Sequence, residues 1–211
     1  HKRFPEYKAT REKMPEDLVE QLPYLPRLVE ALNLPYLIIP GYEADDIVGT
    51  LMRLCRESKI EGVMVTSDKD FMQLVGEKIV MLNHRNELIG IRGVQEKFGC
   101  VPDQVADLLG LMGDSSDNIP GVRGVGEKTA IKLISEFGSI EGVYENIEKI
   151  SGKSLKEKLE TGHGNALLSR ELATIDCNVP LSVSLENFHL RETDLYNNDE
   201  LYALLEELEF R

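Results

Sequence analysis

The sequence predicts an α/β lobe followed by a mostly helical lobe. Short apolar runs of strand length alternate with amphipathic helical segments over the first 92 residues, which is typical of a mainly parallel sheet flanked by helices. From Gly93 onward, predicted helices follow one another and are joined by short glycine-rich turns. We therefore expect two domains, over residues 1–92 and 93–211.

The spacing of apolar residues predicts the individual elements. In the first lobe we expect a helical stretch over 16–32 that Pro23 and Pro26 kink or divide, a helix over 44–56, strands over 36–39, 62–66 and 78–82, and a fourth strand candidate over 87–91. In the second lobe we expect helices over 93–99, 102–112, 127–137, 139–147, 153–160, 163–174 and 198–209.

Composition narrows the class of protein. The 211 residues are 42% hydrophobic, which is ordinary for a folded chain, and no apolar run approaches the roughly 20 residues of a membrane span. We expect no signal peptide, and the three cysteines form no C-x-x-C pair, so we also expect reduced thiols and a cytoplasmic protein. The net charge of −13 opposes DNA binding, unless the acids gather around metal ions.

Acidic residues cluster where predicted elements end. The clusters are Glu43, Asp45 and Asp46 after the strand 36–39, Asp68 and Asp70 after the strand 62–66, and Asp114 and Asp117 between two helices. Each cluster alone could simply cap a helix. Seven like charges brought together require cations, and oxygen ligands without His or Cys suit Mg²⁺ or Mn²⁺. We therefore expect a site for two such ions, which would activate water for phosphodiester hydrolysis.

The stretch from Ile119 to Ala130 has the glycine spacing of a helix–hairpin–helix element. Its glycines allow backbone N–H groups to approach a DNA phosphate, and the helix that begins near Gly126 adds its positive end. The alternative is a purely structural turn between packed helices. We expect DNA contacts from Gly121, Val122, Gly124, Val125, Gly126, Lys128 and Thr129.

Basic and aromatic residues are interleaved at the start of the chain. Lys2, Arg3, Lys8, Arg11 and Lys13 surround Phe4 and Tyr7, a mixture that suits single-stranded nucleic acid. On its own, such a run is more often a solvated arm.

Together these motifs resemble the flap endonuclease family, specifically the 5′-nuclease domain of bacterial DNA polymerase I. The resemblance spans nearly the whole chain. It is carried by residues 7–11, 40–46, 66–70 and 112–130, and also by 172–175 and 205–211. It implies a PIN-like nuclease lobe, and a structure-specific 5′-nuclease that acts in replication and repair on DNA with a free 5′ end, nick or flap.

The resemblance also implies residue roles. Glu43, Asp45, Asp46, Asp68, Asp70, Asp114 and Asp117 would serve the metal site. Lys8 and Arg11 would steer the scissile phosphate, Tyr7 would meet a base, and the hairpin would hold duplex DNA with a monovalent cation such as K⁺. Asp68, Asp70, Lys8 and Arg11 would be the catalytic residues. The Asp114 and Asp117 pair favours the polymerase-linked type, with polymerase domains in the same parent chain.

The chain departs from the family pattern at its start. The family begins with a strand that carries a metal-binding Asp, followed by a second Asp and an Arg, and none of these precedes His1. We therefore expect a nuclease lobe that is incomplete at its N-terminus and part of a longer protein. Two alternatives stay open, namely a catalytically weak module that only binds DNA, and a stand-alone 5′-nuclease.

Overall fold

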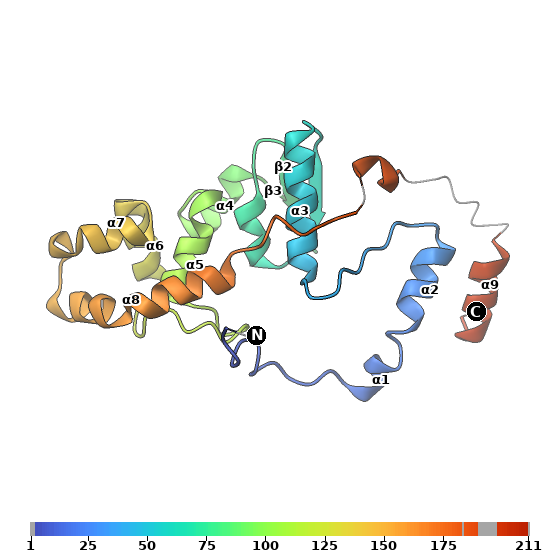
Figure 1. Cartoon of the computed structure of the whole chain (residues 1–211), viewed down its shortest axis with the longest axis horizontal. Helices are drawn as coiled ribbons and strands as arrows, with labels where there is room; N and C mark the ends of the chain where they lie inside the picture. The colour runs from blue at the N-terminus through green and yellow to red at the C-terminus, as the bar shows by residue number, and fades with distance from the viewer. Residues whose placement is uncertain (1–2, 183, 190–197, 211) are drawn as a thin grey trace. The chain divides into compact units, whose positions relative to one another are not determined.

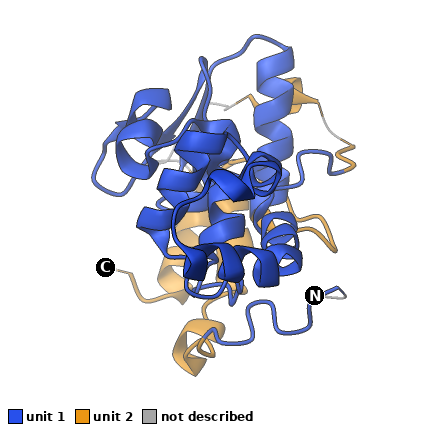
Figure 2. Ribbon diagram, turned by 90° about the vertical axis from the view of Figure 1, so that its left-hand side faces the viewer, with its two compact units in different colours: residues 1–11, 45–179 blue, residues 12–44, 180–211 orange. Residues whose placement is uncertain are grey.

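The computed structural model describes residues 3–182, 184–189 and 198–210, and Figure 1 shows their secondary structure. The chain forms two compact units, which Figure 2 distinguishes by colour. Unit 1 comprises residues 1–11 and 45–179, and unit 2 comprises residues 12–44 and 180–211. Each unit is considered by itself. Lys2 of the predicted basic stretch lies outside the described residues.

Unit 1 contains a three-stranded sheet in the order β1-β2-β3. β1 (Gly62–Val65) runs parallel to β2 (Ile79–Leu82), and β2 pairs antiparallel with β3 (Leu88–Ile89). The strands expected over 62–66, 78–82 and 87–91 are thus confirmed. Alternate residues of β1 and β2 point into the core, where Ile79 and Met81 are fully buried.

The prediction of a strand over 36–39 was wrong. These residues, which belong to unit 2, have no strand assignment. Side chains of Tyr36 and Ile38 are 50% and 65% exposed, so this apolar run is not enclosed as a central strand would be. A strand also needs a neighbouring strand for its backbone hydrogen bonds, and the pairing described for the sheet involves β1, β2 and β3 alone.

Helices surround this sheet and lead into the helical part of unit 1. The α-helices are α3 (Ala44–Glu57), α4 (Ile91–Phe98), α5 (Val105–Met112), α6 (Glu127–Phe137) and α7 (Ile140–Glu145). Short 3₁₀ segments are η1 (Lys69–Leu74), η2 (Pro102–Gln104) and η3 (Ile147–Lys149). Leu108, Leu109 and Leu111 of α5 are fully buried, which makes α5 the centre of this helical core.

α8 (Lys153–Ala173) is one helix of 21 residues. The sequence predicted two helices with a break near Thr161 and Gly162, and this was wrong. Gly162 does not interrupt the helix. It allows close packing instead, because a Cβ at this position would lie 2.7 Å from Cγ1 of Val122. The glycine therefore serves a tertiary contact that helix propensity alone does not reveal.

Unit 2 consists of short helices. α1 (Glu16–Val19) and α2 (Tyr24–Ala31) divide the predicted 16–32 stretch into two pieces, as expected from its prolines. α2 contacts α9 (Asp199–Glu207), where both terminal nitrogens of Arg27 donate to the Glu207 carboxylate at 3.0 and 2.6 Å. A further segment, η4 (Leu185–Phe188), belongs to this unit.

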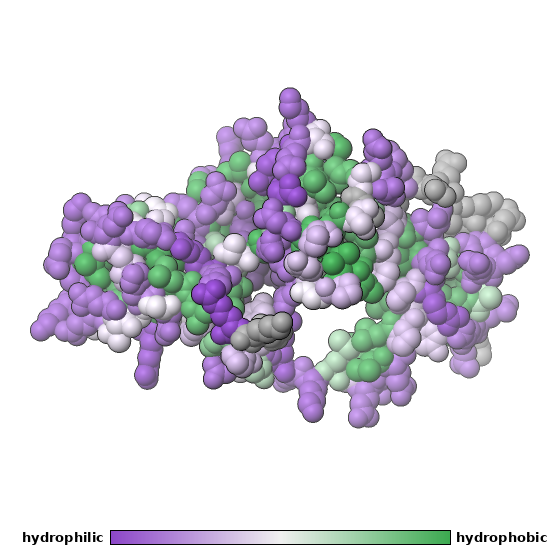
Figure 3. Space-filling model, in the orientation of Figure 1, coloured by the Kyte–Doolittle hydropathy of each residue, from purple (hydrophilic) through white to green (hydrophobic). Residues whose placement is uncertain are grey.

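Unit 2 also exposes apolar side chains. Leu18, Val19, Leu22 and Leu25 are 40–51% exposed, and Figure 3 shows this apolar surface in green along the stretch that holds α1 and α2. Across the part of the chain that the structure describes, no helix is both long and apolar enough to cross a membrane.

Candidate metal centre and nucleic-acid interface

Asp68 and Asp70 lie just beyond the carboxyl end of β1. Asp68 is the N-cap of η1, and its Oδ1 accepts a hydrogen bond from the backbone N–H of Asp70 at 3.0 Å. The hydroxyl of Thr66 accepts from the N–H of Asp68 at 3.1 Å. These bonds fix the turn that follows the strand, and a carboxylate at an N-cap is locally favourable.

Asp114 and Asp117 are carried by a closed loop after α5. Asp114 and Ile119 form a β-bridge with N–H to O distances of 2.9 and 2.7 Å. Gly113 ends α5 with φ 75° and ψ 179°, a conformation that only glycine adopts readily. Both aspartates are nearly buried, with exposed fractions of 5% and 7%. Burying two carboxylates requires compensating partners.

The four aspartates Asp68, Asp70, Asp114 and Asp117 line one hollow of about 530 Å³. The structure therefore brings together two of the three predicted acidic clusters, from the end of β1 and from the loop after α5. The lining also includes Arg11, Ser67, Lys69, Lys97 and Ser116. We refer to this hollow as the carboxylate hollow.

Electrostatic crowding is greatest at Asp70. Burial first, and then the negative charges of Asp68, Asp114 and Asp117, raise the pKa of Asp70 to about 7. Its Oδ1 atom is buried and has no hydrogen-bond partner among the described residues. An orphaned buried carboxylate oxygen is costly unless a cation neutralises it. The hollow therefore has the character of a cation site.

Asp114 shows the opposite balance. Burial alone would raise its pKa, but hydrogen bonds from Ser116 and Lys69 outweigh this and lower the pKa of Asp114 below its ordinary value. Oδ1 of Asp114 accepts from the Ser116 N–H at 2.9 Å and from the Ser116 hydroxyl at 2.6 Å. Lys69 Nζ lies 2.9 Å from Oδ2. Asp114 is therefore ionised at neutral pH.

Basic side chains from the N-terminal segment meet Asp117. The Arg11 guanidinium donates to Oδ1 of Asp117 at 3.2 and 2.5 Å, and Lys8 Nζ lies 3.8 Å from Oδ2. The backbone N–H of Lys8 donates to the carbonyl of Asp117 at 2.8 Å. The Tyr7 hydroxyl lies 3.4 Å from Oδ2 of the same residue. The predicted catalytic cations and aromatic residue are thus placed on the loop that carries Asp117.

The donor set of the carboxylate hollow fits a divalent cation of the Mg²⁺ type. Its donors are carboxylate oxygens, and one of them, on Asp70, is buried with no hydrogen-bond partner among the residues that the structure describes. Within the described ranges, no three His, Cys, Asp or Glu side chains are grouped tightly enough to hold an ion as they stand. Lys69, Lys8 and Arg11 take up oxygens of Asp114 and Asp117 in this arrangement.

The third acidic cluster is divided between the two units. Asp45 and Asp46 lie in the first turn of α3 and do not line the carboxylate hollow. Oδ1 of Asp45 accepts from the Asp46 N–H at 2.9 Å, and Oδ1 of Asp46 accepts from the Asp176 N–H at 2.9 Å. Glu43 belongs to unit 2. The assignment of these three residues to a metal site therefore stays a prediction.

The predicted hairpin is formed as a tight turn before α6. Gly121 and Gly124 have φ of 58° and 81°, and Gly126 is the N-cap of α6. Lys128 lies in the exposed first turn of α6, and Thr129 is half-buried beside it.

Several hairpin amides are already engaged. The N–H groups of Gly121, Val122 and Val125 donate to Ser169 Oγ at 2.9 Å, Leu111 O at 2.8 Å and Val122 O at 2.9 Å, respectively. The valine side chains are buried. Over the described part of the chain, the N–H groups of Arg123, Gly124 and Gly126 have no such acceptor and remain for a phosphate.

Sequence reasoning missed Lys69 and Lys97 as residues of the carboxylate hollow. Lys69 stands between Asp68 and Asp70, so its position in that motif was a usable signal. Lys97 lies in the last turn of α4, where a basic residue is common for reasons of the helix dipole alone. No local feature distinguishes it from a solvated lysine.

Comparison with known families decides the assignment. Residues 1–99 match the 5′–3′ exonuclease N-terminal resolvase-like domain, and residues 100–195 match the 5′–3′ exonuclease C-terminal SAM fold. The chain belongs to the 5′–3′ exonuclease family. The α/β lobe and the helical lobe expected from the sequence are confirmed by this pair of domains.

Relatives of the chain include bacterial DNA polymerases. DNA polymerase I of Bacillus subtilis is 42% identical over 215 residues, which cover 100% of this chain and 24% of the relative. DNA polymerase I of Caldicellulosiruptor bescii is 41% identical, with coverage of 99% and 25%. The chain thus spans about a quarter of the length of these relatives.

Solved structures show the same fold. The T5 5′-exonuclease with bound divalent zinc ions has a TM-score of 0.71 at 25% identity, over 83% of this chain and 69% of that one. The bacteriophage T5 flap endonuclease, in a pseudo-enzyme-product complex with DNA and metal ions, also has a TM-score of 0.71 at 25% identity, over 83% and 68%.

Proposed function

We propose that this chain is the structure-specific 5′-nuclease part of a DNA polymerase I. It hydrolyses phosphodiester bonds near the 5′ end or 5′ flap of branched DNA, in replication and repair in the bacterial cytoplasm. The observation that carries the proposal is the buried oxygen of Asp70, which has no hydrogen-bond partner in the described part of the chain and lies in a hollow that Asp68, Asp114 and Asp117 share. The likeness to metal-bound T5 nucleases supports it.

In the proposed arrangement, residues 1–92 form the nuclease lobe with most of the metal ligands, and residues 93–211 carry the duplex-binding hairpin and add Asp114 and Asp117 to the metal site. Asp68, Asp70, Asp114 and Asp117 would hold Mg²⁺ or Mn²⁺, with Glu43, Asp45 and Asp46 contributing to a site for two ions. When bound, such ions lower the pKa of a water molecule and stabilise the leaving oxygen. Neutralising Asp70 and its neighbours removes the crowding that raises the pKa of Asp70.

The chain's own cations orient the substrate. Arg11 and Lys8 share the Asp117 carboxylate, and both would transfer to a scissile phosphate that enters beside the hollow. Tyr7, on the same segment, offers an aromatic ring to a neighbouring base. At the hairpin, the amides of Gly124 and Gly126, with Lys128 and Thr129, bind duplex phosphate, and a K⁺ ion would assist there.

A second function has one observation in its favour. Within the described residues no three acidic, His or Cys side chains form a ready metal cluster, which would suit a module that docks DNA but cuts it weakly. A stand-alone nuclease is less well supported, because the relatives named above are DNA polymerases I.

Cleavage of an end-labelled 5′-flap duplex tests the proposal. We expect cutting close to the branch with Mg²⁺, and none with a chelator. Asp68→Asn should abolish cleavage and preserve DNA affinity, since Asp68 is remote from the hairpin in sequence and lines the hollow. Binding without Mg²⁺-dependent cutting would select the docking module instead, and cutting by Asp68→Asn at the wild-type rate would refute the metal assignment.

A further inference from the structure

The glycine hairpin packs against one side of α8. The Ser169 hydroxyl, fully buried, accepts the N–H of Gly121 at 2.9 Å. Gly162 lies against Val122 so closely that a Cβ would meet Cγ1 of that valine at 2.7 Å. Positions 162 and 169 are seven apart, which places them on the same side of an α-helix. α8 is therefore the platform on which the hairpin is held.

Lys158 lies on the same side of α8 as Gly162 and Ser169, nearer the start of the helix. It precedes Gly162 by four residues, and its Nζ lies 3.0 Å from where a Cβ of Gly124 would be. Gly124 is one of the residues whose N–H remains for a phosphate. The ammonium group of Lys158 thus lies directly beside the turn proposed to bind phosphate. It continues the contacts that Ser169 and Gly162 of the same helix make with the hairpin.

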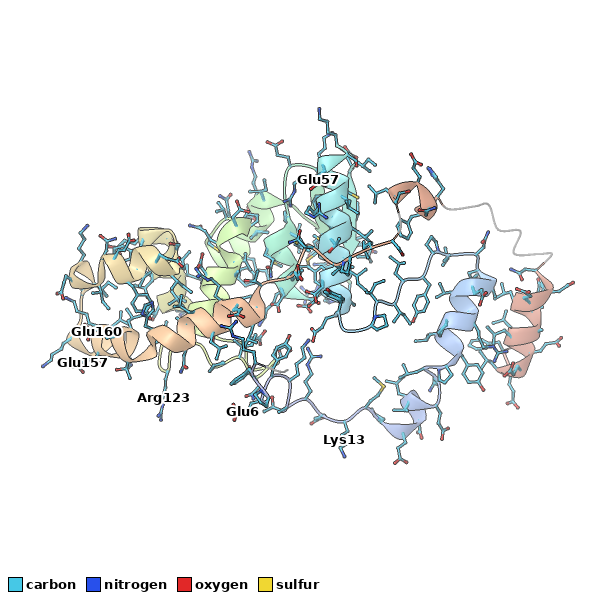
Figure 4. All side chains as sticks on the ribbon, in the orientation of Figure 1. Glu6, Lys13, Glu57, Arg123, Glu157 and Glu160 are labelled. Atoms are coloured by element: carbon cyan, nitrogen blue, oxygen red, sulfur yellow. The ribbon has the colours of Figure 1, made fainter. Side chains whose placement is uncertain are left out.

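Lys158 and Arg123 have no carboxylate partner among the described residues. Lys156, on the same helix, has its Nζ 3.0 Å from Glu148. Figure 4 shows Arg123 extending outward from the loop beside α8. These two cations are therefore electrostatically available to a phosphate.

The two cations border a hollow of about 500 Å³ between the hairpin and α8. Its remaining lining is mainly small and hydroxyl or amide in character, with Ser154, Thr161 and Asn165. Guanidinium, ammonium, hydroxyl and amide groups are the side chains that bind phosphate oxygens. Glu157 is the one acid in the lining, and it lies 3.9 Å from Lys153.

We propose that this hollow binds a second backbone phosphate of duplex DNA, adjacent to the phosphate held by the hairpin. Lys158 and Arg123 supply the charge, and the Asn165 amide supplies a neutral donor. The contact is independent of base sequence and lengthens the duplex footprint along α8. This inference rests on the proposed function, because it takes the hairpin to be the duplex-binding element.

The test is the salt dependence of binding to a blunt fluorescent duplex, measured by anisotropy at several KCl concentrations. Lys158→Ala should weaken binding roughly tenfold at low salt, as expected for loss of a charge-assisted contact, and should reduce the slope of log Kd against log salt by about 1. Arg123→Ala should act in the same direction. Glu157→Gln should tighten binding, because it removes the one negative charge of the hollow.

Lys156→Ala is the matched control. It removes the same charge from the same helix, but position 156 lies about 200° around the helix from position 158, and its partner is Glu148. The salt slope of this variant should equal that of the wild type. Equal slopes for Lys158→Ala and Lys156→Ala would overturn the second phosphate site alone. A wild-type protein that binds no duplex at any salt would overturn the hairpin's role, and this inference with it.

Discussion

The Arg11 guanidinium lies 2.5 Å from a carboxylate oxygen of Asp117, although the two residues are 106 positions apart in sequence. This ion pair holds the N-terminal segment on the loop that carries two of the four acids of the carboxylate hollow. It also means that a protein cation takes up an oxygen that a divalent metal would use. Under the proposed function, Arg11 and the metal would therefore compete for Asp117 until DNA offers Arg11 a phosphate.

Arg11→Ala should separate these two roles. We expect divalent metal to bind about two- to fivefold more tightly, since a competing partly exposed ion pair is removed. Cleavage of flap DNA should fall roughly 100-fold, because a charged group near the scissile phosphate is lost. Calorimetric Mn²⁺ titration and single-turnover cleavage measure the two effects. Arg92→Ala, on α4 and outside the lining of the hollow, is the control; weaker metal binding by Arg11→Ala would show that no competition exists.

Asp70 predicts a pH-dependent stability in metal-free protein. Burial and neighbouring acids raise its pKa to about 7, so the folded protein retains this proton where the unfolded chain, with a pKa near 3.8, has lost it. Stability should therefore fall as pH rises from about 4 to about 7, and then level off. Asp70→Asn should remove this trend and be more stable by about 2 kcal/mol at pH 8, after allowance for solvent screening.

Urea unfolding at a series of pH values, with a chelator present, measures this difference. Saturating Mg²⁺ should stabilise the wild type and leave Asp70→Asn nearly unaffected, because the metal neutralises the same charge. A wild type that becomes more stable than Asp70→Asn as pH rises in chelator would contradict the crowding of charge at Asp70.

Thr50 secures the segment that leaves α8. Its side chain is 1% exposed, and its hydroxyl accepts the N–H of Val179 at 3.0 Å and approaches the Asp176 carbonyl at 3.5 Å. Thr50→Val keeps the shape and leaves the buried Val179 N–H without an acceptor, which should cost about 1–3 kcal/mol. Thr50→Ser, which keeps the hydroxyl, should lose less. Denaturant midpoints compare the two, and equal losses would mean that packing alone matters at this position.

Two glycines of α8 form a matched pair. Gly162→Ala should destabilise the protein by about 1–3 kcal/mol, because its Cβ would overlap Val122. Gly164→Ala meets nothing within 4 Å and should stabilise the helix by about 0.5–1 kcal/mol. The melting temperatures of both variants, compared with that of the wild type, measure these two changes in stability. A neutral Gly162→Ala would mean that the hairpin does not rest on α8 as closely as the structure places it.

Much of the site was predictable because it depends on local sequence. Asp68 and Asp70 were found from their position after a buried strand, and Asp114 and Asp117 from a polar loop between two apolar helices. Both pairs line the same hollow, because the turn after β1 and the loop after α5 meet there. The glycine spacing predicted the hairpin, since positive φ at Gly121 and Gly124 is a local requirement.

What sequence could not supply were facts of tertiary packing. The apolar run at 36–39 looks like a buried strand, and only its exposed side chains show otherwise. Gly162 looks like a helix break until Val122 is seen against it. The pairing of Lys69 with Asp114, and the engagement of Asp46 with the Asp176 N–H, arise from chain segments far apart in sequence or from side-chain directions that no periodicity encodes.

The location of Mn²⁺ in crystals of this protein tests the central claim most directly. Anomalous diffraction should place Mn²⁺ in the carboxylate hollow, with Asp70 Oδ1 among its ligands at about 2.1 Å. We expect Arg11 to have left Asp117 in the metal-bound protein. Mn²⁺ bound only at other acids, with Asp70 Oδ1 still partnerless and Arg11 still on Asp117, would contradict the assignment of this hollow as the metal centre.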